Sequence, residues 1–149
     1  MRVFIAIEVP EKIKKELEKI QELFNEDIAN ITFVETSKFH LTLKFFGEIS
    51  NVKLERVRSR LEGFSFKDFD LELSSLGVFP NRNYVSVLWV GLKPERKVQE
   101  LKKKIEENLR DMFGVDNKFR AHLTIGRVKS ILDKDRFFEI LDGSEVGGR

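Results

Sequence analysis

The apolar residues of the chain follow two periods, one typical of strands and the other typical of helices. Residues 3–9 form a short, mostly apolar run that ends at Pro10, which predicts a buried strand. From Glu11 the apolar positions recur three and four residues apart, which predicts an amphipathic helix that buries Ile13, Leu17, Ile20 and Phe24. The chain is therefore expected to begin with a strand followed by a helix.

Two stretches, 38–45 and 119–125, alternate strictly between polar and apolar residues. A period of two predicts strands with one face toward the core and the other toward solvent. In the first stretch Lys38, His40, Thr42 and Lys44 alternate with Phe39, Leu41, Leu43 and Phe45. In the second, Arg120, His122 and Thr124 alternate with Phe119, Ala121, Leu123 and Ile125.

Shorter patterns predict the remaining elements. Strands are expected at 31–34, 69–73 and 84–92, with a turn at 80–83 before the last of them. Three further helices are marked by Leu54, Val57 and Leu61, by Val98, Leu101, Ile105 and Leu109, and by Phe137, Phe138 and Leu141. The tail, residues 143–149, is expected to be unstructured. The charge-rich stretches at 11–19 and 102–107 are interpreted as solvated helix faces.

The chain contains an internal repeat, because His122 lies 82 residues after His40 in the same sequence context. The same offset relates residues 3–7 to 85–89 and Lys38 to Arg120. The helix positions of the two halves are out of phase by about three residues, which indicates a small insertion. A duplicated strand-helix-strand unit is expected to form two pseudo-symmetric lobes, with the two motif strands facing one cleft.

Size and composition indicate one soluble globular domain spanning residues 1–149. The chain is 41% apolar and 35% charged, and no apolar run approaches the roughly 20 residues of a membrane span. We therefore expect a cytoplasmic protein without membrane contact. Zero cysteines exclude thiol catalysis and cysteine-ligated zinc. The net charge of +2 permits an anionic ligand, but any phosphate recognition must be local.

The only two histidines of the chain, His40 and His122, occupy the same His-Leu-Thr-apolar pattern. In a strand, His and Thr two residues apart point to the same face, while the residues between and after them face the core. Two imidazoles facing one cleft suit a reaction that needs a base and an acid near neutral pH. Hydrolysis of a cyclic phosphodiester is such a reaction. Thr42 and Thr124 would donate hydrogen bonds to its nonbridging phosphate oxygens.

The segments 39–48 and 121–127, with the opening residues 1–7, resemble the 2H phosphoesterase superfamily, and in particular the RNA 2′,3′-cyclic phosphodiesterases, also called 2′-5′ RNA ligase-like proteins. The resemblance implies an α+β fold of two antiparallel-sheet lobes facing a central cleft, with helices outside. It implies hydrolysis of a terminal 2′,3′-cyclic phosphate to a 2′-phosphate, with His40 as proton donor to the 3′ oxygen and His122 as proton acceptor from water.

The two-histidine chemistry requires no metal, and we expect no cofactor, a monomeric enzyme, and RNA ends with a 2′,3′-cyclic phosphate, tRNA fragments or nucleotides as partners. The resemblance also implies that this chain ends early for the family, near Glu145. A metal site built on the two histidines is the rival interpretation, but neither motif contains an Asp, Glu or Cys to complete a ligand set.

Three basic residues are candidates for substrate binding. Lys38 and Arg120 occupy matched positions on the histidine face, where a solvated strand-end charge is the alternative interpretation. Arg127 lies five residues after His122, so strict alternation would point it to the opposite face. A bulge at Gly126 would turn it toward the phosphate, and the family often has an arginine there.

Two other functions stay open on the sequence. The same residues would support the reverse reaction, which joins a cyclic phosphate end to a 5′-hydroxyl as a 2′-5′ linkage. A binding module would use the cleft for nucleotides or RNA ends without turnover, although it has no need of two titrating groups. Four aromatic residues are candidates for stacking a base, with core packing as the alternative: Phe46, Phe79, Tyr84 and Trp89.

Overall fold

The computed structural model describes residues 2–116 and 118–143, so the predicted unstructured tail beyond Gly143 lies outside the described residues. Strands and helices follow one another largely as the sequence predicts, with the two histidines opening two of the strands. The elements are β1 (Arg2–Glu8), α1 (Glu11–Leu23), β2 (Ala29–Phe33), a short 3-10 helix (Thr36–Lys38), β3 (His40–Glu48), α2 (Asn51–Glu62), β4 (Glu72–Pro80), β5 (Val85–Lys93), α3 (Glu95–Asn108), β6 (His122–Ile131) and α4 (Lys134–Gly143).

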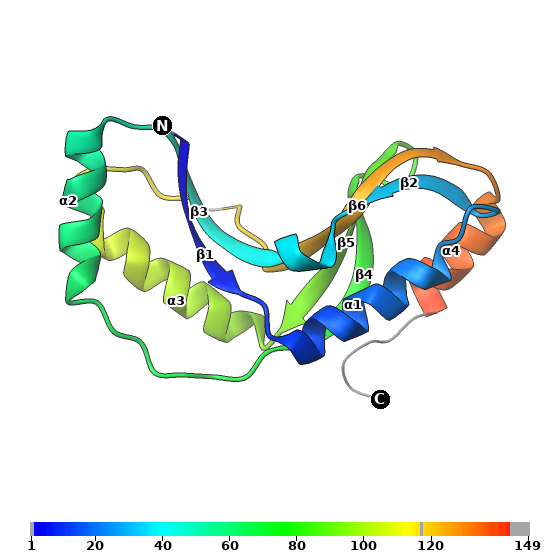
Figure 1. The fold of residues 1–149 in the computed structure, drawn as a ribbon, viewed down its shortest axis with the longest axis horizontal. Helices are drawn as coiled ribbons and strands as arrows, with labels where there is room; N and C mark the ends of the chain where they lie inside the picture. Colours follow the sequence, from blue (N-terminus) through cyan, green and yellow to red (C-terminus); the bar gives the residue numbers. More distant parts are fainter. Residues whose placement is uncertain (1, 117, 144–149) are drawn as a thin grey trace.

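Within the described residues the strands form two antiparallel sheets. The smaller sheet pairs β1 with β3, and the larger one has the order β2-β6-β5-β4. Figure 1 shows α2 and α3 beside the smaller sheet, and α1 and α4 beside the larger one. The predicted α+β class with two antiparallel sheets is therefore confirmed. No described helix has the length and apolarity that crossing a membrane requires.

The two lobes exchange elements between the two halves of the chain. β2 belongs to the first half but pairs with β6 of the second, and α1 packs on the larger sheet (Figure 1). α3 belongs to the second half but its Lys102 binds β3. Gly126 permits the close approach of β2, because a Cβ there would lie 2.6 Å from Ile31 Cγ2 and 2.8 Å from the Thr32 carbonyl oxygen.

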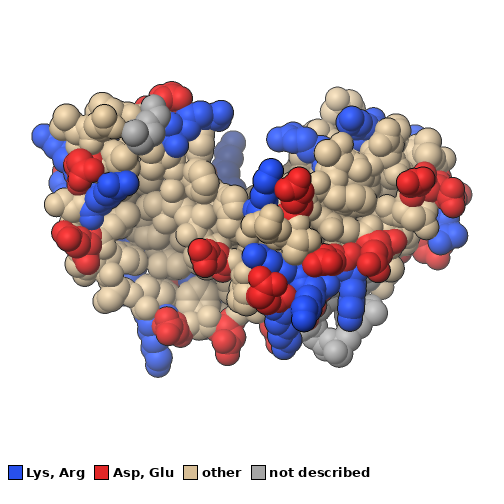
Figure 2. Space-filling view, viewed as in Figure 1, with Lys and Arg blue, Asp and Glu red and all other residues tan. Residues whose placement is uncertain are grey.

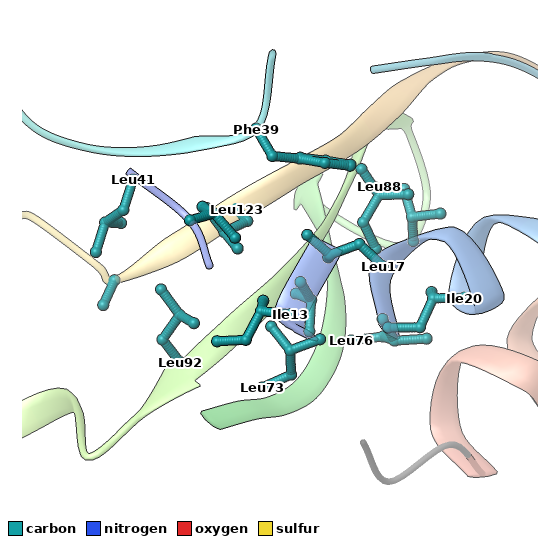
Figure 3. Packing of buried hydrophobic residues seen from close by; sticks show 14 of the residues in the cluster. Ile13, Leu17, Ile20, Phe39, Leu41, Leu73, Leu76, Leu88, Leu92 and Leu123 are labelled. Atoms are coloured by element: carbon teal, nitrogen blue, oxygen red, sulfur yellow. The ribbon is translucent and has the colours of Figure 1, made fainter. Parts of the chain in front are cut away.

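The core beneath the larger sheet confirms the helix predicted from Glu11. Ile13, Leu17 and Ile20 are buried and lie beside Leu73, Leu76 and Leu88 of β4 and β5 (Figure 3). Full burial of such a side chain contributes about 1.5–3 kcal/mol. β4 begins at Glu72, later than the predicted strand at 69–73, and continues to Pro80, which shortens the predicted turn.

A β-bulge at Leu43 breaks the alternation predicted for the first motif strand. The pairing with β1 skips Leu43, since Thr42 pairs with Ala6 and Lys44 with Ile5. Leu43 and Lys44 are consequently both buried, whereas Phe45 is 54% exposed. The predictions of an exposed Lys44 and a buried Phe45 were therefore wrong, because one extra residue reverses the faces of the residues that follow it, here up to a second irregularity at Phe46.

The second motif strand carries the equivalent bulge at Ile125. Its pairing with β5 skips Ile125, since Thr124 pairs with Trp89 and Gly126 with Leu88. Ile125 and Gly126 are both buried and Arg127 is exposed. The bulge thus returns Arg127 to the face of His122 and Thr124, and it lies at Ile125, one residue before the predicted position at Gly126.

The strand pairing allows the two halves of the predicted repeat to be compared element by element. The motif strands are offset by 82 residues, but their partner strands are offset by 83, since Trp89 is the equivalent of Ala6. The buried residues Leu17 and Ile20 of α1, and Phe24 directly after it, lie 81 residues before Val98, Leu101 and Ile105 of α3. Matched in this way, the helices differ from the motif strands by one residue in their offset, where the sequence predicted about three.

An exposed ion pair joins α2 to the end of α3. Arg60 donates to the two carboxylate oxygens of Asp111 at 2.7 and 2.6 Å and to the Asn108 carbonyl at 2.9 Å. The hydrogen bonds from Arg60 hold the pKa of Asp111 below its ordinary value. The folded chain therefore releases this proton more readily than the unfolded chain.

This pair is expected to make stability depend on pH. Its contribution is fully present above the ordinary carboxyl pKa of about 3.9 and is lost as the pH falls through the lowered folded value. We expect Asp111→Asn to lower the thermal midpoint at pH 7, and the difference from the native protein to shrink in acid. Asp68→Asn, a change at an exposed carboxylate, is the matched control. A difference that stays constant with pH would contradict the expectation.

Candidate active site

Both histidines are oriented by the same backbone contact. The Nδ1 atom of His40 lies 2.8 Å from the Lys38 carbonyl oxygen, and Nδ1 of His122 lies 2.7 Å from the Arg120 carbonyl oxygen. A carbonyl only accepts, so Nδ1 carries the hydrogen and donates it. In each neutral ring Nε2 is then the basic nitrogen, available to a ligand.

The histidines and threonines of the two motifs line the same pocket. Its volume is about 210 Å³, and His40, Thr42, His122 and Thr124 all line it. The remaining lining residues are Val34, Lys38 and Phe39. This volume is below the roughly 300–1,000 Å³ of pockets that hold drug-sized ligands, so it suits a small group such as a cyclic phosphate.

A larger hollow of about 1090 Å³ lies between α1 and β2 and contains neither histidine. Its lining includes Glu18, Glu22, Glu26 and Asp27, whose negative charges disfavour a phosphate ligand. We therefore place the candidate active site in the smaller pocket. Figure 2 shows a notch between the two lobes, with Lys and Arg side chains on both of its rims.

Aromatic rings hold the two imidazoles in different ways. Phe4 stacks on His40 with ring centroids 5.3 Å apart and planes 17° apart, and is 47% exposed. His122 instead contacts Phe79 at 5.3 Å and Trp89 at 6.1 Å, both in tilted or edge arrangements. Phe79 and Trp89 also stack on each other at 5.0 Å. The two equivalent histidines therefore have different surroundings.

The sequence prediction treated Phe4 as part of a buried strand and missed its contact with His40. The residues of β1 alternate between exposed and half-buried positions, and Phe4 shares the exposed face with Arg2 and Glu8. Arg2 and Glu8 could have indicated that Phe4 is exposed, because a period of two places residues 2, 4, 6 and 8 on one face of the strand.

A helix side chain holds each bulge beside the pocket. Lys102 of α3 donates to the Leu43 carbonyl at 2.6 Å, and Gln21 of α1 donates to the Ile125 carbonyl at 3.4 Å. Gln21 also donates to the Val34 carbonyl at 3.0 Å. Because Leu43 and Ile125 directly follow the two motif threonines, these hydrogen bonds help to fix the direction of both motif strands.

A buried charge network surrounds the first of these contacts. Lys44, Lys102 and Glu106 are all at least nine-tenths buried. Glu106 Oε2 accepts from Lys44 Nζ at 2.9 Å and from the Asp116 backbone N–H at 2.9 Å, and lies 3.9 Å from Lys102 Nζ. Lys44 also donates to the Gly114 carbonyl at 2.9 Å. The network connects β3, α3 and the loop that leads to His122.

The interpretation of residues 102–107 as a solvated helix face was therefore wrong for Lys102 and Glu106. Burial lowers the pKa of the Lys102 ammonium, against the opposing effect of the Glu106 carboxylate. Both side chains occupy the buried face of α3 together with Val98, Leu101 and Ile105. A Lys and a Glu four residues apart in a helix give the same sequence pattern whether they face solvent or pair with each other in the core.

The three basic candidate residues lie at different places relative to the pocket. Lys38 lines the pocket, and its ammonium lies 3.5 Å from the Glu35 carboxylate. Arg120 lines an adjoining cavity that shares Thr42 and His122 with the pocket. Arg127 lies on the same strand face as His122, but it lines neither cavity. Its contact with phosphate stays a prediction.

Sequence comparison places the chain among known phosphoesterases. A family model described as LigT like phosphoesterase matches residues 7–89. The chain belongs to the LigT-like phosphoesterase family. An RNA 2′,3′-cyclic phosphodiesterase of Methanocaldococcus jannaschii is 39% identical over 137 residues, which cover 91% of this chain and 76% of that protein. A protein of the same name from Methanothermobacter thermautotrophicus is 32% identical over 155 residues, 99% of this chain and 83% of that protein.

Solved structures share the fold of this LigT-like phosphoesterase. The protein TT0787 of Thermus thermophilus has a TM-score of 0.76 at 24% identity, over 87% of this chain and 75% of that one. LigT of E. coli complexed with 3′-AMP has a TM-score of 0.69 at 24% identity, over 85% of this chain and 71% of that one. In this family member, the described residues contain no group of three or more His, Cys, Asp or Glu side chains placed to hold a metal ion.

Proposed function

We propose that this phosphoesterase hydrolyses the terminal 2′,3′-cyclic phosphate of RNA to a 2′-phosphate by acid-base catalysis with His40 and His122. The observation that carries the proposal is the single pocket in which both histidines and both threonines meet. The hydrogen bonds at Nδ1 leave Nε2 of each ring for the substrate. The names of the archaeal relatives support the same reaction and RNA as its substrate.

The reaction needs one proton acceptor and one proton donor. Neutral His122 takes a proton from water through Nε2, and the water oxygen forms a new bond to phosphorus. The bond from phosphorus to the ribose 3′ oxygen breaks, and that oxygen takes a proton from the Nε2 atom of the His40 imidazolium. The ring face of Phe4 against His40 is a favourable neighbour for a cationic ring. Proton exchange with water then restores both histidines.

The two threonines have a separate role in this proposal. Negative charge grows on the nonbridging phosphate oxygens as the pentavalent centre forms, and hydroxyl donors on each side stabilise it. Thr42 and Thr124 follow the histidines by two residues on the same strand face and line the same pocket.

The test is to incubate the protein, with a chelator present, with a short RNA that ends in a 2′,3′-cyclic phosphate. We expect a 2′-phosphate product, identified by mass and by comparison with authentic 2′- and 3′-phosphate standards. A 3′-phosphate product would contradict the proposed direction of ring opening. Binding without turnover would favour the binding-module interpretation.

A second reaction with a 5′-hydroxyl RNA included distinguishes hydrolysis from 2′-5′ ligation, because ligation yields a longer oligonucleotide. Both reactions use the same histidines, so this experiment distinguishes hydrolysis from ligation but does not test the location of the site. A monomeric state and a cytoplasmic location stay predictions from the sequence.

A further inference from the structure

Two hollows adjoin the catalytic pocket and share lining residues with it. The first has a volume of about 390 Å³ and shares Thr42 and His122 with the pocket. The second, of about 600 Å³, shares Phe39 and His40 with it. The catalytic pocket itself accommodates only a small group, so the rest of an RNA end must extend beyond it. The charges of the two hollows favour one direction.

The hollow beside His122 offers cations without carboxylate partners. Lys118 and Arg120 line it, both are exposed, and neither side chain lies within 4.0 Å of a carboxylate among the described residues. The Asp116 carboxylate in the same wall accepts from the Lys118 backbone N–H at 3.0 Å and lies 3.8 Å from Lys102 Nζ. The two unpaired cations are therefore available to a phosphodiester.

Aromatic rings occur in the same hollow. Phe45, Phe79 and Phe119 line it, and Phe45 is 54% exposed. The bulge at Leu43 places Phe45 on this surface and not in the core. An exposed ring beside unpaired cations is the combination that binds single-stranded nucleic acid, in which a base stacks while a cation binds the backbone.

The hollow beside His40 has the opposite character. Its charged lining residues are Glu8, Glu11 and Lys14, and Lys14 lies 3.6 Å from the Glu11 carboxylate. One carboxylate in excess disfavours a phosphodiester at this position. The negative charge of a phosphodiester therefore favours binding in the hollow beside His122.

We propose that the hollow beside His122 is a subsite for the RNA chain upstream of the cyclic phosphate, and that the chain reaches it past Thr42, which lines both cavities, from a ribose held on the side of His40. Lys118 and Arg120 bind the phosphodiester on the 5′ side of the terminal nucleoside, and Phe45 stacks the base of the preceding nucleotide. This inference rests on the proposed function and narrows its substrate to RNA ends of at least two nucleotides. A mononucleotide leaves the subsite empty.

The test compares adenosine 2′,3′-cyclic phosphate with the dinucleotide adenylyl-adenosine 2′,3′-cyclic phosphate. We expect a higher kcat/KM for the dinucleotide than for the mononucleotide. In a Lys118→Ala variant, kcat/KM for the dinucleotide should fall about three- to tenfold, while kcat/KM for the mononucleotide changes less than twofold. The preference shrinks as salt rises, because exposed charges are screened. Lys12→Ala, an equal change of charge on an exposed position of α1, is the matched control.

Equal kcat/KM for the two substrates, or an equal loss for both in Lys118→Ala, would overturn the subsite. Binding of the two 2′-phosphate products, measured by calorimetry, tests it without turnover. If neither substrate is hydrolysed but the dinucleotide product binds more tightly and Lys118→Ala removes the difference, the proposed function fails and the subsite stands. If both are hydrolysed without preference, the function stands and the subsite fails.

Discussion

His40→Ala and His122→Ala are each expected to lower kcat for cyclic phosphate hydrolysis by about 10²–10⁴-fold. Each change removes one of two proton-transfer groups, and no other histidine in the chain is available to replace it. The double variant is expected to be little slower than either single variant, because groups that act as a unit are strongly non-additive. Single-turnover rates on an RNA 2′,3′-cyclic phosphate measure all three.

The folded state is the control for this result. Each imidazole donates one hydrogen bond to a nearby backbone carbonyl at the start of its strand, which contributes about 0.5–1.5 kcal/mol. Thermal midpoints should therefore change only slightly while activity collapses. Near-native turnover in either single variant, with the fold intact, would remove that histidine from the proposed mechanism.

Glu106→Gln is expected to lower the free energy of unfolding by about 3–5 kcal/mol, the typical cost of removing one partner from a buried ion pair. Glu106 is 6% exposed, and the change leaves Lys44 and Lys102 buried without their shared carboxylate. At about 2–4 °C per kcal/mol for a chain of this size, the thermal midpoint should fall by roughly 6–20 °C. Calorimetry or thermal circular dichroism measures the shift.

Glu107→Gln is the matched control, because Glu107 is the exposed neighbour on the same helix. Its thermal midpoint should stay near that of the native protein. A triple change of Lys44, Lys102 and Glu106 to methionine should recover much of the stability lost in Glu106→Gln, since a buried ionic network and an apolar cluster of similar volume are often comparable in stability. Equal midpoints for Glu106→Gln and Glu107→Gln would show that the buried network contributes little.

The network has a consequence for the active site as well as for stability. Lys102 holds the carbonyl of the residue after Thr42, and Glu106 holds the backbone of the loop that leads to His122. Gln21 makes the corresponding contact in the second lobe, to the residue after Thr124. In each lobe a helix side chain therefore holds the backbone directly after the motif threonine.

The exchange of elements between the lobes also bears on function. β2 joins the larger sheet, and the chain then crosses through the short 3-10 helix to begin β3 at His40. Val34, at the end of β2, donates its backbone N–H to the Ile125 carbonyl at 2.9 Å and lines the catalytic pocket. The crossing segment thereby connects the two motif strands at the point where the histidines meet.

The sequence by itself indicated most of the elements and the candidate residues of the site. Periods of two and of three to four placed the strands and helices, because local burial patterns follow directly from backbone geometry. The duplicated His-Leu-Thr pattern identified four of the residues that line the pocket, since His and Thr two residues apart in a strand must share a face.

Only the tertiary structure decided the two bulges, the exchange of β2 between lobes and the burial of Lys102 and Glu106. A bulge is a property of two paired strands, so no pattern within residues 38–45 revealed that Phe45 faces the cleft and Lys44 the core. A buried ion pair likewise depends on residues 62 positions apart in the chain, Lys44 and Glu106, meeting in space. Local periodicity carries no information about such partners, because they are selected by pairing and packing between distant elements.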